Sequence, residues 1–175
     1  ATSTQQARLY AYDLKEKEWA SDWSAEPMVL NLESNAFTGD ATSEDWDRDY
    51  VDDAVYFGLN TGTAAATDGR VARLRLRSDQ GAGSWLSAAS IGTLVDVQRS
   101  VIGSPLTKAD IYGRRWVYFG TGRVLVGSDN ANSQQQYFYG VKEPINTDYD
   151  LTYGAVSTGT LLDISNLRVF TNPDS

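Results

Sequence analysis

Four aspartates in one short segment have the spacing of a loop that surrounds a calcium ion. From residue 45 to residue 53 the chain reads Asp-Trp-Asp-Arg-Asp-Tyr-Val-Asp-Asp, with carboxylates at loop positions one, three, five and nine. Ca²⁺ takes about six to eight oxygen ligands, and alternate side chains plus a main-chain carbonyl at position seven can supply them from one turn. The predicted ligands are Asp45, Asp47, Asp49, the carbonyl of Val51, and Asp53.

The same loop has a simpler interpretation, as a solvated acidic turn without a metal. An EF-hand would carry glycine at position six and a bidentate glutamate at position twelve, where this chain has Tyr50 and Tyr56. Two unit charges about 4 Å apart repel by roughly 1 kcal/mol in water, so clustered carboxylates favour either a cation or open solvent. The register of the carboxylates favours calcium.

The composition excludes several kinds of chemistry. The net charge is −8, with 15 Lys and Arg against 23 Asp and Glu, which disfavours nucleic acid and anionic membranes as partners. Histidine and cysteine are both absent, so the chain cannot build a Ser-His-Asp triad, a thiol nucleophile or a thiolate zinc site. Paired carboxylates remain available for glycosidase chemistry, but the acidic loop is too crowded and hydrophilic for that role. We expect a protein that is not an enzyme.

The segments on either side of this loop, which must position it, have sequence patterns that predict β-strands. Beta-branched and aromatic runs separated by Gly, Asn, Asp and Ser clusters predict strands at residues 8–13, 27–32, 54–58, 73–77, 115–120, 136–141 and 167–170. In 73–77 leucines alternate with arginines, which predicts a half-buried strand with its arginines in water, or alternatively a phosphate-binding face. No run approaches the roughly 20 apolar residues of a membrane span. The predicted fold class is all-β.

A weak internal repeat refines this fold class. Val55 to Gly58 recurs as Val117 to Gly120, and residues 8–14 resemble 70–76, both at an offset of 62. A fixed period containing strands and glycine-rich turns is typical of β-propeller blades. The chain has room for about three blades, fewer than a closed propeller needs. We therefore expect one domain over residues 1–175, a partial propeller whose ends contact a partner chain or a further copy, with residues 144–175 unassigned.

Other residues allow both functional and structural interpretations. The tryptophans could stack sugars or form adhesive contacts, but as a group they are expected to fill the wedges between blades. Trp46 is the predicted exception, a partly exposed contact residue with charged neighbours. Residues 129–132 could bind metal but favour an Asx turn. Residues 120–123 resemble part of a phosphate loop but lack the Lys-Ser/Thr ending, which favours a turn.

Two ordered motifs resemble the C-terminal β-propeller of PilY-type proteins of type IV pili. The first is the acidic loop running into a strand, from Asp45 through Asp53 to Tyr56 and Gly58, and the glycine-to-arginine strand from Gly69 follows it. The second runs from Trp116 to Arg123 and continues from Gln134 to Glu143. The likeness covers roughly residues 8–143. The chain departs from the family pattern at Tyr50, which replaces a glycine, at Leu59 and at Glu143.

The resemblance implies a function and a location. A family member would bind Ca²⁺ in this loop, support pilus assembly, oppose retraction and mediate adhesion at the cell surface or pilus tip, which it reaches through the periplasm and outer membrane. Its partners would be minor pilins or other pilus components, the remaining propeller segments, and host or surface ligands. Tyr50 would have to make a tight turn, with a predicted positive φ. The alternative is a calcium-dependent propeller enzyme of the quinoprotein type.

Overall fold

The computed structural model describes residues 4–10, 12–13, 18–19, 29–63, 66–76, 91–147 and 150–166. Antiparallel sheets dominate these ranges, and they contain two 3-10 helices but no α-helix. The prediction of an all-β chain is confirmed. The sheets are open in the described ranges, since each has two edge strands. No helix there is long and apolar enough to cross a membrane.

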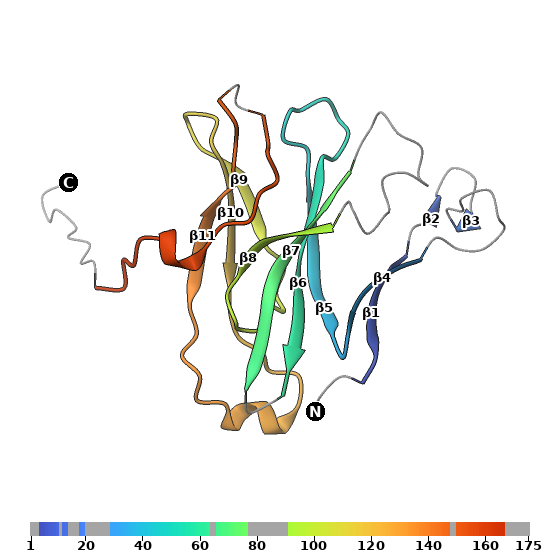
Figure 1. Ribbon diagram of the computed structural model, residues 1–175, viewed down its shortest axis with the longest axis vertical. Coiled ribbons are helices and arrows are strands. Elements are labelled where there is room, and N and C mark those ends of the chain that lie inside the picture. The colour runs from blue at the N-terminus through green and yellow to red at the C-terminus, as the bar shows by residue number, and fades with distance from the viewer. Residues whose placement is uncertain are drawn as a thin grey trace, which may run out of the picture.

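The largest sheet has four strands in chain order and lies at the centre of the molecule (Figure 1). Its strands are β5 (Phe37–Glu44), β6 (Ala54–Gly62), β7 (Thr67–Arg75) and β8 (Ile91–Asp96). The β6–β7 pairing is unbroken from Ala54 opposite Arg75 to Gly62 opposite Thr67. Strand β6, to which the acidic loop leads, is therefore paired with β7 along its whole length.

Smaller sheets lie on either side of this central sheet (Figure 1). One pairs β1 (Gln6–Tyr10) with β4 (Val29–Ser34), and near it β2 (Tyr12–Asp13) pairs with β3 (Glu18–Trp19). On the other side, β10 (Arg115–Gly120) lies between β9 (Leu106–Ala109) and β11 (Phe138–Lys142). The predicted strands at 8–13, 27–32, 54–58, 115–120 and 136–141 match these elements within a few residues, whereas 167–170 lies outside the described residues.

Two apolar clusters hold the three main sheets together. The first lies between the β1–β4 sheet and one face of the central sheet, and its members are Ala7, Ala36, Phe57, Leu59, Ala72 and Leu74. The second lies between the other face and the β9–β11 sheet, and it includes Tyr56, Val71, Leu94, Val101, Val117, Phe119 and Val141. Because the central sheet is covered on both faces, each of its inner strands is buried at six of its nine positions.

A connecting segment crosses the central sheet at Gly58 and fixes this second interface. A Cβ built on Gly58 would lie 1.7 Å from the carbonyl oxygen of Val101, so only glycine lets the two backbones approach this closely. The Asn60 side chain holds the crossing residue from both sides, accepting from Val101 N (2.6 Å) and donating to Val101 O (3.0 Å). The segment from β8 to β9 is thereby part of the core.

The sequence predicts that residues 73–77 form a half-buried strand with its arginines in solvent, and this prediction is wrong for the first arginine. Arg73 is 1% exposed, and it bonds to Glu143 across the interface between the central sheet and the β9–β11 sheet. The alternation of side chains is correct, since Leu74 faces the first cluster. The error concerns the other face, which the β9–β11 sheet covers. A two-residue alternation records which side chains share a face, and it carries no information about what covers that face.

Candidate metal centre

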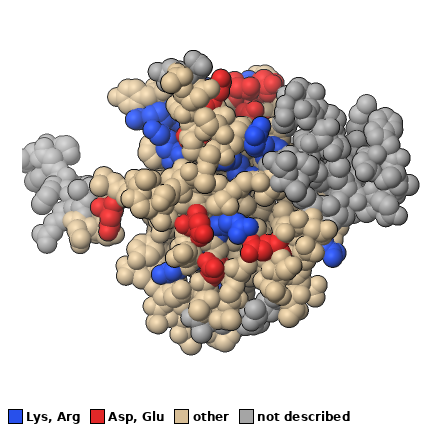
Figure 2. All heavy atoms as spheres, in the orientation of Figure 1, with Lys and Arg blue, Asp and Glu red and all other residues tan. Residues whose placement is uncertain are grey.

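The acidic segment is the hairpin loop that joins β5 to β6. Asp53 N donates to Glu44 O at 2.8 Å and closes the loop at its base. The loop lies at the same end of the molecule as the β9–β10 hairpin (Figure 1). Acidic side chains gather at that end in the space-filling view (Figure 2). The paired strands therefore hold the two ends of the segment together while its middle turns in solvent.

Three of the predicted ligands converge in this loop. Carboxylate oxygens of Asp45, Asp47 and Asp49 all lie within 4.8 Å of one another. Among the described residues no lysine or arginine forms an ion pair with them. Asp45 is half-buried, and the other two are exposed. Three acidic oxygens at this separation can share one cation, and hard oxygen ligands suit Ca²⁺.

The main chain of the loop turns around Asp45. Its Oδ1 accepts from Arg48 N (2.6 Å) and Asp49 N (3.2 Å), and its Oδ2 accepts from Tyr50 N (2.8 Å). Asp47 and Asp49 cap the next turns, since each accepts from the amide two residues ahead, at 3.1 Å and 2.8 Å. These amide bonds shape the loop.

The other two predicted ligands, Asp53 and the carbonyl of Val51, are not among the three convergent carboxylates. Asp53 Oδ2 accepts from Trp46 N (2.6 Å) and Asp47 N (3.3 Å). Val51 is 45% exposed, and its amide donates to Asp49. Three of the five predicted ligands are thus brought together, while Asp53 fastens the first half of the loop to its end.

The turn at loop position six is made without glycine. Tyr50 has φ +73°, as expected, and Arg48 has φ +66°. A non-glycine residue in this region is uncommon and costs of order 1 kcal/mol or more. The side chain of Tyr50 is 99% exposed, so packing of the ring does not hold this conformation. The amide bonds to Asp45 therefore carry the turn.

The carboxylates at the centre of the loop have pKa values shifted in opposite directions. Partial desolvation raises the pKa of Asp45, but the amides of Tyr50, Arg48 and Asp49 outweigh it and lower the net value. The pKa of Asp47 is raised, first by desolvation and then by the negative charges of Asp53 and its other acidic neighbours, against one amide bond that lowers it. Crowded negative charge without a counter-cation is the condition that a bound cation relieves.

Trp46 is not the exposed contact residue that its charged neighbours predicted. It is 7% exposed and belongs to the second apolar cluster. Its Nε1 donates to the Tyr56 hydroxyl (2.9 Å), and that hydroxyl donates to Glu143 Oε1 (2.6 Å). The side chain points away from the acidic neighbours, which face solvent. Trp46 therefore anchors the loop in the core.

Trp46 is connected to a buried ion pair that joins two sheets. Arg73 Nη1 donates to both oxygens of Glu143, at 3.0 Å and 2.8 Å. Burial and the Glu143 carboxylate raise the pKa of Tyr56, which stays a neutral donor. Sequence reasoning missed Glu143 as a structural partner. Its sequence signal is weak, because the residues that it contacts are 70 and 87 positions away.

The β9–β10 hairpin provides an internal comparison. Asp110, the first residue after β9, occupies the position of Asp45 and likewise accepts two loop amides, from Tyr112 and Arg114. It also binds the Arg114 guanidinium (2.6 Å) and Trp116 Nε1 (3.1 Å). Desolvation is outweighed by the bonds from Trp116 and Arg114, which lower the pKa of Asp110 to about 2. A cationic side chain neutralises this turn, unlike the acidic loop.

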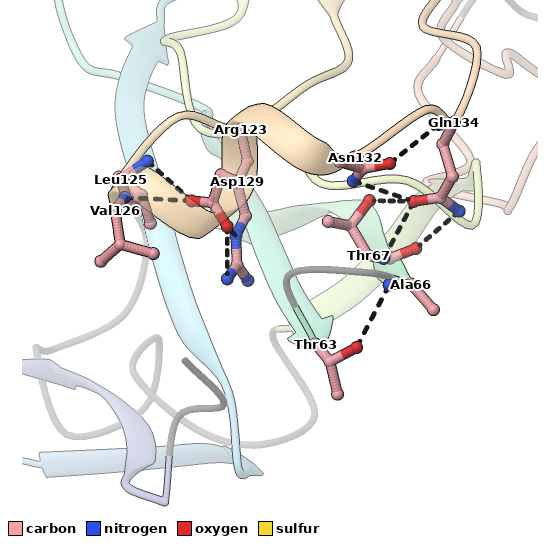
Figure 3. A network of polar contacts seen from close by, with 9 residues as sticks. All are labelled: Thr63, Ala66, Thr67, Arg123, Leu125, Val126, Asp129, Asn132 and Gln134. Carbon is pink, nitrogen blue, oxygen red and sulfur yellow. Dashed lines mark hydrogen bonds and ion pairs between the residues drawn. The ribbon is translucent and has the colours of Figure 1, made fainter.

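A second group of polar contacts shows that Asp129 is not available to a metal (Figure 3). Its carboxylate accepts from Arg123 Nε (3.2 Å) and from the amides of Leu125 (2.8 Å) and Val126 (3.1 Å), at the start of the 3-10 helix η2 (Gly127–Ala131). The Arg123 bond is the main cause of a pKa lowered to about 2. Nearby, Gln134 Oε1 accepts from Thr67 N (2.9 Å) and Oγ1 (2.7 Å). The turn interpretation of residues 129–132 agrees with these contacts.

No protein-family model, curated protein or solved structure was found to match the chain.

Proposed function

We propose that this protein is a calcium-binding, non-enzymatic module of a type IV pilus assembly and tip protein, with a partial β-propeller fold. The observation that carries the calcium site is the convergence of Asp45, Asp47 and Asp49 in a hairpin loop without a neutralising cation. The pilus assignment rests on the sequence resemblance to PilY-type proteins. It implies a location at the cell surface or pilus tip, reached through the periplasm and outer membrane.

The arrangement of the sheets supports the propeller part of the proposal. The β1–β4, β5–β8 and β9–β11 sheets pack face to face in chain order. The repeated residues point the same way, since Val55 and Phe57 face the preceding sheet and so do Val117 and Phe119. Propeller blades also pack successively with equivalent faces, in a radial repeat around a central axis.

Calcium would act on the stability and shape of the hairpin. A cation bound by the three carboxylates removes their mutual repulsion and holds the turn that Tyr50 makes at positive φ. Because Trp46 anchors this loop to the buried contact between Tyr56 and Glu143, an ordered loop also supports the interface between two sheets. Adhesion and binding to minor pilins would then depend on the ion through the geometry of this end of the molecule.

Calorimetric titration of the chelated protein with CaCl₂ tests the site. We expect one binding event, with an affinity of about 10⁻⁴ to 10⁻³ M if the site resembles other extracellular calcium modules. Asp47→Ala and Asp49→Ala each remove one of the three convergent oxygens and are expected to abolish the binding heat. Asp163→Ala, which removes an exposed aspartate outside the cluster, is the matched control and should leave it unchanged. Unchanged heat in both loop variants would place the ion elsewhere.

The pilus role has its own experiment. Purified minor pilins immobilised on a sensor should bind the wild-type chain in millimolar CaCl₂, and the chelator EDTA should release it. The Asp49→Ala variant should bind no better in calcium than in EDTA. If calcium binds by calorimetry but no minor pilin binds in either condition, the metal site stands and the pilus partner is wrong.

A further inference from the structure

The outer face of the β9–β11 sheet repeats a face that is covered elsewhere in the molecule. At the offset of 62 residues, Tyr118 corresponds to Tyr56 and Gly120 to Gly58. Tyr56 and Gly58 lie on the face of the central sheet that the β9–β11 sheet and its connecting segment cover. The equivalent face of the β9–β11 sheet carries Tyr118, Gly120 and their neighbours, and no described sheet packs on it.

The exposed face is apolar and aromatic. Leu106 is 67% exposed and Phe138 is 75% exposed, on either side of Tyr118. The rings of Trp116, Tyr118 and Phe138 are nearly parallel, with interplanar angles of 14° and 10° between neighbours. Together with residues 161–165 they line a groove of about 880 Å³. A large apolar face of this kind marks an interaction site in a soluble protein.

The two equivalent glycines differ in what lies above them. A Cβ on Gly58 would collide with the Val101 backbone, whereas a Cβ on Gly120 would meet nothing within 4 Å. Gly120 has no positive φ to explain it. Glycine inside a strand commonly marks the close approach of another backbone, and none of the described residues makes that approach at Gly120.

The polar groups of the face indicate the charge of what covers it. Over the central sheet, the Tyr56 hydroxyl and Arg73 both bind the carboxylate of Glu143, which the covering sheet supplies. On the β9–β11 sheet neither the Tyr118 hydroxyl nor Lys142, which is paired opposite Trp116, bonds to a carboxylate of the described residues. A hydroxyl donor and an ammonium group beside an apolar face call for a carboxylate.

We infer that this face, defined by Leu106, Trp116, Tyr118, Gly120, Phe138 and Lys142, docks a further β-sheet. The docking sheet presents valine- and phenylalanine-type side chains to the aromatic rings, passes its backbone over Gly120, and places a carboxylate between the Tyr118 hydroxyl and Lys142. The inference rests on the stacked-sheet part of the proposed function and does not depend on the calcium site.

The probe for this test is a backbone-cyclised hairpin copied from the covering sheet. It joins residues 115–120 to residues 138–143 through two tight turns, and it carries W116T, Y118T and F138T so that its own outer face cannot self-associate. We expect the hairpin, at millimolar concentration, to shift amide NMR signals of the full chain at β10 and β11. The same hairpin with Glu143→Gln should bind about tenfold more weakly, because the carboxylate is lost.

Two substitutions in the full chain complete the test. Tyr118→Phe removes the donor and should weaken hairpin binding about tenfold, while Tyr112→Phe, at a tyrosine 74% exposed in the β9–β10 hairpin, should not. Gly120→Val should leave the chain folded, since the space above it is open, and should block the hairpin. Retained amide dispersion in each variant shows that the fold is intact.

Three results would overturn the inference. The first is the absence of NMR signal shifts at millimolar hairpin. The second is hairpin binding that changes with neither Glu143→Gln in the probe nor Tyr118→Phe in the chain. The third is an equal set of shifts with maltohexaose, which would make the face a sugar-binding surface. The hairpin titrations are run in EDTA and so are independent of the calcium site. A failed hairpin titration beside a separate, normal calcium titration therefore rejects the docking face alone. A failed calcium titration beside normal hairpin binding rejects the metal site alone.

Discussion

Three aspartates show how the surroundings of one residue type decide its role. Asp45, Asp110 and Asp129 each accept two or more backbone amides from the turn that follows or precedes them. Asp110 and Asp129 also bind an arginine, whereas Asp45 lies beside Asp47 and Asp49. A carboxylate beside an arginine is already neutralised, so it is the residue without one that offers a place for a cation.

The buried ion pair of Arg73 and Glu143 is expected to contribute strongly to the free energy of unfolding. Glu143→Gln leaves the guanidinium of Arg73 buried without its counter-charge, and breaking a buried pair in this way costs about 3–5 kcal/mol. Urea unfolding should show that loss. Arg114→Ala, which breaks an exposed pair, should cost less than about 1 kcal/mol. Equal effects of the two variants would contradict the structural role assigned to Glu143.

The Asp129 carboxylate gives the chain an acid-sensitive contribution to stability. Its pKa falls from 3.8 to about 2 on folding, mainly through the Arg123 bond, so the folded state binds fewer protons than the unfolded state. The contribution is fully present above pH 4 and is lost as the pH falls towards 2. Urea unfolding between pH 4 and pH 2 should therefore show a steeper loss of stability in wild type than in Asp129→Asn. Identical slopes would refute this role.

Among the elements, the hairpins and crossing segments carry the specific features, and the strands carry the packing. The β5–β6 and β9–β10 hairpins join equivalent strand pairs, but the first loop is longer and acidic. The segment between β8 and β9 is not a passive connection, because Val101 is fully buried and held by Asn60. Loops mounted on paired strands can vary in sequence without disturbing the sheets.

The close backbone crossing at Gly58 leads to a prediction about the stability of the central sheet. Gly58→Ala forces the crossing backbone away from β6 and should cost about 3 kcal/mol or more, because the collision is with main chain. Gly120→Ala, the matched change in β10, should alter the free energy of unfolding by less than about 1 kcal/mol. Thermal unfolding measured by circular dichroism compares the two. If Gly58→Ala is as stable as wild type, the close approach at Val101 is absent in solution.

At the scale of the whole molecule, the central sheet is the element that contacts both neighbouring sheets and the acidic loop. It packs on a sheet at each face, and the acidic loop leaves it at one end. An ion that binds only the folded loop must therefore stabilise the whole cooperative unit and not the loop alone. The magnitude follows from mass action, about 2.7 kcal/mol at a hundredfold excess over the dissociation constant.

Calcium is accordingly expected to raise the melting temperature of the whole chain. At 2–4 °C per kcal/mol, roughly the value for a chain of this size, a hundredfold excess should raise it by about 5–10 °C relative to EDTA. Scanning calorimetry over a series of CaCl₂ concentrations gives the shift. Asp47→Ala should melt at one temperature in calcium and in EDTA. A wild-type melting temperature indifferent to calcium would contradict the metal site.

The sequence by itself determined the all-β class, most strand positions and the acidic loop with its turn at Tyr50, because these depend on local alternation, turn chemistry and spacing along the chain. Only the tertiary structure decided which faces are covered. Arg73 and Trp46 are buried, Asp53 lies outside the group of convergent carboxylates, and Glu143 bonds to residues 70 and 87 positions away. Alternation tells which side chains share a face, but the partner of that face comes from distant strands.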